Sequence, residues 1–233
     1  MSKASEAIIE KGRKITAHIF ETAEADIVYD DCIFRVAGTD RTMSLFDVAR
    51  ASNKPENLPE GIEPGLDETY SHTPDAPTYP NGCHICEIEI DPETGILEII
   101  KYTVMDDFGD VVNPLLIEGQ VHGGIVQGIG QALQEHTVYE NNSGQLVTAS
   151  FMDYRLPRAD DFPYFDFNMR NVKCVTNPLG IKGSGEAGAI GAPASIINAI
   201  IDALHKADGS IEIDMPATPD VIWQAANSPL AAE

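Results

Sequence analysis

The chain has 233 residues, of which 43% are hydrophobic and 22% are charged, so it can form one large domain or two small ones. Asp and Glu number 37 against 15 Lys and Arg, which gives a formal net charge of -22. A field of this sign repels nucleic acid and anionic membrane surfaces, so neither is expected as a partner. No apolar run reaches the roughly 20 residues of a membrane-spanning helix, and residues 1–14 lack the apolar segment of a secretory signal, so we expect a cytoplasmic location.

The first part of the chain predicts a helix, a hairpin and a second, short helix. Apolar residues recur at helical spacing over residues 3–22, and two β-rich runs follow around Asp30 and Asp31. Ser44 is a suitable N-cap for a helix that ends near Arg50. Six prolines then predict an extended connector. We therefore expect three parts, which are residues 1–54, the connector 55–80 and a C-terminal part 81–233.

The C-terminal part predicts mixed helices and strands. Residues 83–107 indicate two strands joined by a turn at 91–95, and Asn113 and Pro114 are typical of the start of a long helix. Further expected features are a turn at Gly144, strands at 146–152 and 165–175, a glycine loop at 180–191, a helix from Pro193 to Asp208-Gly209, and a β-rich run at 210–214. The fold class is therefore α+β, with mixed sheets packed against helices that include one long glycine-rich helix.

Cys83 and Cys86 have the spacing of half a zinc site. The sequence from Cys83 to Ile90 alternates like a strand, and residues three apart on a strand point to opposite faces. A second pair of ligands is also missing, so packing explains these cysteines better than a metal does.

The long helix is unusual because it contains five glycines, which are Gly119, Gly123, Gly124, Gly128 and Gly130. At about 1 kcal/mol each relative to alanine they cost on the order of 5 kcal/mol, so something must require them. Val121, Ile125 and Ile129 form an apolar stripe, and a neighbouring side carries glycines beside Gln120 and Gln127. Such a side suits either close packing against another segment or hydrogen bonding to a polar heterocycle, and the residues alone leave both interpretations open.

The loop at 180–191 contains the pattern G-x-G-x-x-G at Gly183, Gly185 and Gly188, which is the fingerprint of dinucleotide-binding folds. The fingerprint requires a helix that begins within the glycines, whereas the expected start at Pro193 is several residues late. Glu186 is a single carboxylate between glycines, where a large ligand could approach closely. It is either a general base or a solvent-facing loop residue.

Three long motifs together resemble the large subunits of molybdenum hydroxylases, the xanthine dehydrogenase, aldehyde oxidase and aerobic carbon monoxide dehydrogenase family. They read GQVHGGIVQGIGQAL, SFMDYRLPRADDFP and NPLGIKGSGEAGAIGAPASIINAIIDAL. The resemblance runs from about residue 2 to residue 204, and its wording is closest to the carbon monoxide dehydrogenase-like branch. It implies that the chain is the C-terminal part of the molybdopterin-binding region and that it acts as an oxidoreductase.

The resemblance also implies roles for individual residues. Glu186 would be the catalytic base, which accepts a proton beside the molybdenum while oxygen attacks an electrophilic carbon. Gln120 would hydrogen-bond the pterin, and backbone N–H groups of the glycine loop would face the anionic end of the cofactor. The molybdenum would be held by the pterin, with no protein ligand. The full implied cofactor-binding set is Gln120, Gly123, Gly124, Gln127, Lys182, Gly183, Ser184 and Gly185.

The implied cofactor is molybdopterin cytosine dinucleotide, with iron-sulfur clusters and FAD on partner subunits and a dimer of the full complex. Whole large subunits of the family are much longer, so we expect a split subunit or a fragment that is inactive without the N-terminal molybdenum-domain segment. Two alternatives remain. One is a nicotinamide or flavin dinucleotide-binding domain built on the glycine loop, and the other is a non-catalytic acidic interaction module.

Overall fold

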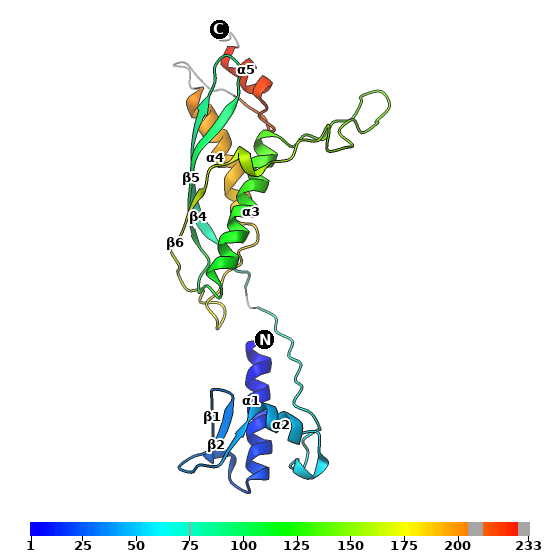
Figure 1. The fold of residues 1–233 in the computed structure, drawn as a ribbon, viewed down its shortest axis with the longest axis vertical. Coiled ribbons are helices and arrows are strands. Elements are labelled where there is room, and N and C mark those ends of the chain that lie inside the picture. Colours follow the sequence, from blue (N-terminus) through cyan, green and yellow to red (C-terminus); the bar gives the residue numbers. More distant parts are fainter. Residues whose placement is uncertain (75, 205–211, 228–233) are drawn as a thin grey trace. The chain divides into compact units, whose positions relative to one another are not determined.

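A computed structural model describes residues 1–74, 76–204 and 212–227. The chain divides into two compact units, Met1–Thr73 and Pro74–Glu233, each with its own core. Both contain helices and strands (Figure 1), so the α+β class is confirmed.

The first unit packs helix α1 (Ser2–Ile19) and helix α2 (Leu45–Ala51) with a small antiparallel sheet of order β1-β2-β3. Its strands are β1 (Ile27–Asp30), β2 (Ile33–Val36) and β3 (Thr42–Ser44). The expected helices and hairpin are confirmed, whereas β3 was not expected. The core residues are buried because they lie on the inner faces of these elements, and they include Ile15, Phe34 and Val48.

The hydroxyl of Ser44 accepts a hydrogen bond from the amide of Asp47 at 3.1 Å, so Ser44 is the N-cap of α2 as expected. The proline-rich stretch begins with a short 3-10 helix, Pro55–Asn57. Leu58, Ile62 and Leu66 then pack against the core of the first unit. The division between the units lies at Thr73, so residues 55–73, which are most of the expected connector, are part of the first unit.

The second unit is built on a three-stranded sheet of order β4-β5-β6. Strand β4 (Asn81–Ile90) is antiparallel to β5 (Leu97–Asp107), and β6 (Phe165–Met169) is parallel to β5. Helices α3 (Pro114–Leu133) and α4 (Ala187–Ala203) share one core with the sheet (Figure 1). That core includes Tyr102, Val104, Val121, Ile125, Ile129, Ile196 and Ile200. A third helix, α5 (Pro219–Asn227), was not expected.

Local signals placed the hairpin and α3 correctly. The strands turn at residues 91–95, and the side chain of Asn113 accepts a hydrogen bond from the amide of Leu116 at 3.3 Å. Pro114 occupies the first turn, where a missing N–H costs nothing. The apolar stripe through Val121, Ile125 and Ile129 is fully buried as expected.

The structure differs from the expectations at four places. Residues 146–152 are not a strand, and β6 ends at Met169 rather than near Val175. Helix α4 begins at Ala187, so Pro193 lies inside it. The physical reason is burial, since Gly188, Ala192, Ile196 and Ile200 form one buried stripe that starts before the proline. The expected helix end at Asp208-Gly209 lies outside the described residues, and residues 212–214 of the expected β-rich run are not a strand.

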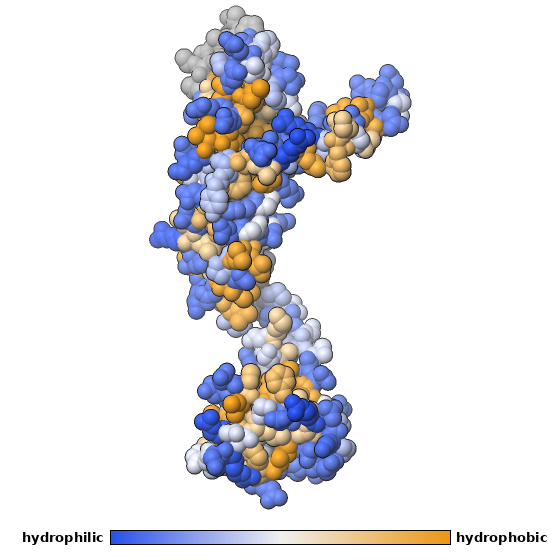
Figure 2. Space-filling view, viewed as in Figure 1, coloured by the Kyte–Doolittle hydropathy of each residue, from blue (hydrophilic) through white to orange (hydrophobic). Residues whose placement is uncertain are grey.

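An irregular arm, residues 134–164, connects α3 to β6 and extends away from the sheet and helices (Figure 1). Within the arm, on either side of the expected turn at Gly144, an isolated β-bridge joins Tyr139 to Leu146. Phe151 and Met152 are 83% and 92% exposed, and the arm carries hydrophobic surface in Figure 2. This arm contains the SFMDYRLPRADDFP motif, whose first residues are exposed, whereas Phe162 near its end packs against the core of the second unit.

Candidate functional site

Helices α3 and α4 touch through bare backbone. A Cβ added at Gly124 would lie 2.9 Å from the Ala189 nitrogen, and one at Gly188 would collide with the Val121 carbonyl oxygen. A Cβ at Gly128 would lie 2.8 Å from the Ala192 Cβ. Close helix packing therefore explains Gly124 and Gly128, although Gly124 was expected to bind a cofactor.

The adjacent face of α3 is open. Gln120, Gly123 and Gln127 are exposed, and a Cβ at Gly119 or Gly123 would meet nothing within 4 Å. Neither glycine has a positive φ that would exclude other residues. Packing within the described chain therefore does not require glycine at these two positions, and the surface that they share with the two glutamines is free to receive another molecule.

The glycine loop lies beside this open face. Nε2 of Gln120 donates a hydrogen bond to the carbonyl oxygen of Gly185 at 3.1 Å, which ties α3 to a residue 65 positions later. Gly183 and Gly185 are exposed and Ser184 is partly buried. A Cβ at Gly185 would also meet nothing within 4 Å. We call the open face of α3 and residues 182–186 together the glycine platform.

Glu186 stands at the edge of the glycine platform as the N-cap residue of α4. Its carbonyl oxygen accepts the amide of Ile190 at 2.9 Å, and its side chain is exposed. In the described part of the chain, this carboxylate makes no hydrogen bond or ion pair. The positive end of the α4 dipole lies beside it. A carboxylate that is placed in this way is able to accept a proton from a bound molecule.

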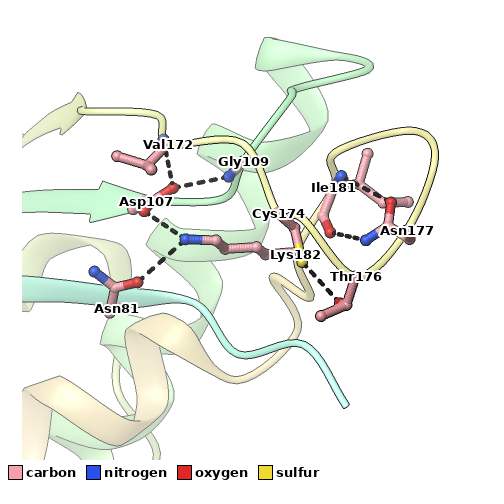
Figure 3. A network of polar contacts seen from close by, with 9 residues as sticks. All are labelled: Asn81, Asp107, Gly109, Val172, Cys174, Thr176, Asn177, Ile181 and Lys182. Atoms are coloured by element: carbon pink, nitrogen blue, oxygen red, sulfur yellow. Dashed lines mark hydrogen bonds and ion pairs between the residues drawn. The ribbon is translucent and has the colours of Figure 1, made fainter. Parts of the chain in front are cut away.

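Lys182 is held by an ion pair at the start of the loop (Figure 3). Its Nζ lies 2.6 Å from Oδ2 of Asp107, and both side chains are mostly buried, at 14% and 9% exposed. Oδ1 of Asp107 accepts the amides of Gly109 and Val172, each at 2.9 Å. Burial acts to raise the pKa of Asp107, but hydrogen bonds from Lys182 and the two amides outweigh it and hold that pKa below its ordinary value. Lys182 therefore anchors the loop to the end of β5.

Cys83 and Cys86 lie on a strand, as the alternation of the sequence predicted. Cys83 is exposed and Cys86 is partly buried on β4. Burial raises the pKa of Cys86 to about 12, so its thiol stays protonated at neutral pH and is a poor metal ligand. No group of three or more His, Cys, Asp or Glu side chains in residues 1–74, 76–204 and 212–227 is placed to hold a metal ion.

The sequence did not predict a second polar cluster, which lies on β4 and β5 where α4 packs against them. Nδ1 of His84 lies 2.8 Å from the hydroxyl of Tyr102, and Nε2 lies 3.6 Å from Oδ1 of Asp106. His84 and Asp106 are 7% and 3% exposed at their side chains. The available signal was the acidic pair Asp106-Asp107 at the end of a strand that is otherwise rich in apolar residues.

Comparisons with known proteins identify the family. The sequence model of a family described as "Molybdopterin cofactor-binding domain" matches residues 1–163, which include α3 and Gln120. The chain belongs to this family. The match covers more than half of the chain, and the relatives described next extend the similarity through the glycine platform.

The large subunit of nicotine 6-hydroxylase from Paenarthrobacter nicotinovorans is 39% identical over 230 residues, which are 97% of this chain and 28% of that protein. The carbon monoxide dehydrogenase large chain of Hydrogenophaga pseudoflava is 33% identical over 224 residues, 95% of this chain and 27% of that protein. The crystal structure of quinoline 2-oxidoreductase from Pseudomonas putida 86 matches with a TM-score of 0.82 and 32% identity over 97% of this chain and 29% of that one. This chain therefore spans less than a third of the length of these relatives. It is more similar in sequence to the nicotine 6-hydroxylase subunit than to the carbon monoxide dehydrogenase chain, although the wording of its motifs favours the carbon monoxide dehydrogenase branch.

The dinucleotide fingerprint lacks its structural context. Helix α4 does begin within the glycines, so a late helix start is not a valid objection. However, residues 170–186 before it contain no strand, and only an isolated bridge joins Ile181 to Gly109. Gly188, the third glycine of the pattern, packs against α3 and is not open to a pyrophosphate.

Among the described residues, every helix is too short or too polar to span a membrane.

Proposed function

We propose that this chain is the C-terminal part of the molybdenum-binding subunit of a molybdenum hydroxylase, and that its glycine platform binds molybdopterin. The observation that carries the proposal is the meeting of Gln120 with Gly185 beside the free carboxylate of Glu186. The family match and the large-subunit relatives support the same cofactor class.

The platform has the properties that a flat polar heterocycle needs. Two exposed amides, Gln120 and Gln127, each offer a donor and an acceptor, as a pterin ring does. The positions around them that lack a Cβ let a large ring approach the helix closely, because Gly119, Gly123 and Gly185 have open space above them. The bound cofactor would supply a Lewis-acidic, redox-active metal.

Each residue of the platform has a distinct task in this proposal. Glu186 accepts the proton that is released as the substrate is hydroxylated, and its free, exposed carboxylate is available to do so. The backbone N–H groups of Gly183, Ser184 and Gly185 would interact with the anionic end of the cofactor. Lys182 acts indirectly, since its Nζ is engaged with Asp107 and fixes where the loop starts.

The proposal extends to the whole enzyme. The nicotine 6-hydroxylase and carbon monoxide dehydrogenase relatives are named as a large subunit and a large chain, and this chain covers 28% and 27% of them. We infer that the cofactor is molybdopterin cytosine dinucleotide, that iron-sulfur and flavin subunits accept the electrons, and that the full complex is a dimer. In this scheme these 233 residues do not turn over substrate by themselves, because residues outside them supply the rest of the pocket.

The test uses the chain co-expressed with the N-terminal portion of a molybdenum subunit. Glu186→Gln should leave molybdenum bound, as measured by elemental analysis, and should reduce turnover by at least about a hundredfold. Asp202→Asn, an exposed acid on the same helix, is the matched control and should change neither quantity. Most activity retained in Glu186→Gln would show that another group is the base. Unchanged molybdenum content after changing Gln120, with assembly lost on enlarging Gly124 or Gly128, would favour a non-catalytic interaction module.

A further inference from the structure

The start of α4 is held from two sides. On one side, Gly188 packs against the backbone of Val121 and Ile125 in α3, where no side chain could be inserted. On the other side, Gly191 packs against the imidazole of His84 on β4, since a Cβ there would lie 2.7 Å from three ring atoms. Glu186 directly precedes this turn, so the position of the first turn sets the position of its carboxylate.

The remaining surroundings of the first turn are loose. Ile190 is 70% exposed. A cavity of about 130 Å³ is lined by Ala187, Ile190 and Gly191 from α4 and by Gly82, His84 and Asp106 from the sheet. Residues that border such a half-open pocket are held less firmly than residues in a close-packed core, because close packing is what fixes side chains and helices. The contact with His84 is therefore the main restraint on this side of the helix.

His84 is itself held in one orientation. The Tyr102 hydroxyl lies 2.8 Å from Nδ1, the two rings meet edge to face at 86°, and Asp106 lies near Nε2. Burial raises the pKa of Tyr102 above its ordinary range, so Tyr102 is a neutral phenol with a proton to donate. A donated proton at Nδ1 leaves Nε2 as the N–H group that faces Asp106. The hydroxyl of Ser195 on α4 lies 2.9 Å from the Gly191 carbonyl oxygen and 3.4 Å from that of His84, which joins helix and strand again.

Asp106 lies beside the other ring nitrogen, at a distance of 3.6 Å that is longer than a hydrogen bond, and it attracts an N–H group there electrostatically. Its Oδ1 faces His84, and its buried Oδ2 has no hydrogen-bond partner among the described residues. A buried carboxylate without partners is costly, and the neighbouring cavity has room for water molecules that would satisfy it.

We infer that His84, oriented by Tyr102 and Asp106, is a positioning residue that fixes the first turn of α4 and thereby the carboxylate of Glu186. The restraint on the helix is a property of this chain alone. Only its consequence for turnover rests on the proposed function of Glu186.

The first test is spectroscopic and needs no variant that could fail to fold. In the 15N-labelled chain, imidazole NMR should show His84 as a single tautomer with hydrogen on Nε2 and none on Nδ1. His136, which is exposed on the arm, is the comparison residue and should show both tautomers in rapid exchange. A hydrogen on Nδ1 of neutral His84, or averaging like that of His136, would overturn the inference.

The second test is hydrogen exchange on the same chain. His84→Leu should speed exchange of the amides of residues 190–192 by at least about tenfold and leave residues 197–203 unchanged. Tyr102→Phe should give a smaller change in the same amides, and His84→Asn, whose side-chain oxygen can replace Nδ1 as acceptor, should restore part of the protection. The exposed change His136→Gln is the control. Unchanged exchange at residues 190–192, or equal acceleration throughout α4 and the sheet, would contradict a local positioning role.

The third measurement connects the restraint to catalysis in the co-expressed complex. His84→Leu should lower kcat while KM and molybdenum content stay near those of the unaltered complex. An unchanged kcat beside faster exchange would contradict the link to Glu186. Failure of the proposed function is distinguishable, because it would appear as retained turnover in Glu186→Gln, whereas Glu186→Gln leaves the NMR and exchange results for His84 as they are.

Discussion

Gly123 and Gly124 are adjacent on α3 but face different surroundings, so replacing each by alanine separates the two reasons for glycine in this helix. Both replacements gain about 1 kcal/mol in helix propensity. Gly123→Ala gains nothing else and loses nothing in this chain, because its Cβ would meet nothing within 4 Å. The free energy of unfolding should therefore rise by about 1 kcal/mol, or the melting temperature of the second unit by roughly 2–4 °C.

Gly124→Ala places a Cβ 2.9 Å from the Ala189 nitrogen and 3.1 Å from the Gly188 Cα. Both atoms are backbone of α4 and cannot rotate away, so the helices must separate, at a cost of about 1–3 kcal/mol for overpacking. The difference between the two variants isolates this steric cost, since the propensity gain is common to both. Urea unfolding of the isolated chain, followed by a signal from the second unit, measures it. Equal stability of the two variants would refute the packing argument.

The same pair of variants tests the open face in the co-expressed complex. A methyl group at Gly123 stands on the surface proposed for the pterin, so Gly123→Ala should lower molybdenum content although it stabilises the chain. Full molybdenum content in a stabilised Gly123→Ala complex would place the cofactor elsewhere.

Three further outcomes concern stability. Lys182→Met should cost about 3 kcal/mol in urea unfolding, because it leaves Asp107 buried without its charged partner, and a loss below 1 kcal/mol would mean that the pair is solvated. The folded pKa of Asp107 is depressed, so its stabilisation is complete above about pH 4, the unfolded value, and is lost as the pH falls through the folded value. The difference in free energy of unfolding between the unaltered chain and Asp107→Asn should thus be constant at neutral pH and narrow in acid. A difference that widens in acid would contradict the direction of this pKa shift. Asn113→Ala should cost about 1 kcal/mol through loss of the α3 cap, with Asn113→Ser retaining most of it.

The elements that the sequence predicted well are those whose signals are local. Asn113 and Pro114 mark the start of α3 by themselves, and the 91–95 turn between alternating runs marks the hairpin. The start of α4 was misplaced because proline is a strong local signal, whereas the burial of Gly188 depends on α3, more than 60 residues earlier.

Local signals also predicted some residues of the candidate site, whereas contacts between distant segments decided the others. Glu186 and Gln120 stood out within their motifs, and the structure brings their segments together through Gly185. The engagement of Lys182 with Asp107 joins residues 75 positions apart, and no spacing rule connects them. The sequence also could not show that Gly123 and Gly124 are needed for different reasons, because their roles depend on which side of α3 is covered by α4.

The most direct measurement of the central claim is the position of molybdenum in crystals of the co-expressed complex, located by anomalous scattering at the molybdenum edge. The account predicts one molybdenum peak beside the glycine platform, near the carboxylate of Glu186. A molybdenum peak remote from α3 and the 182–186 loop, with Glu186 still facing solvent, would contradict it.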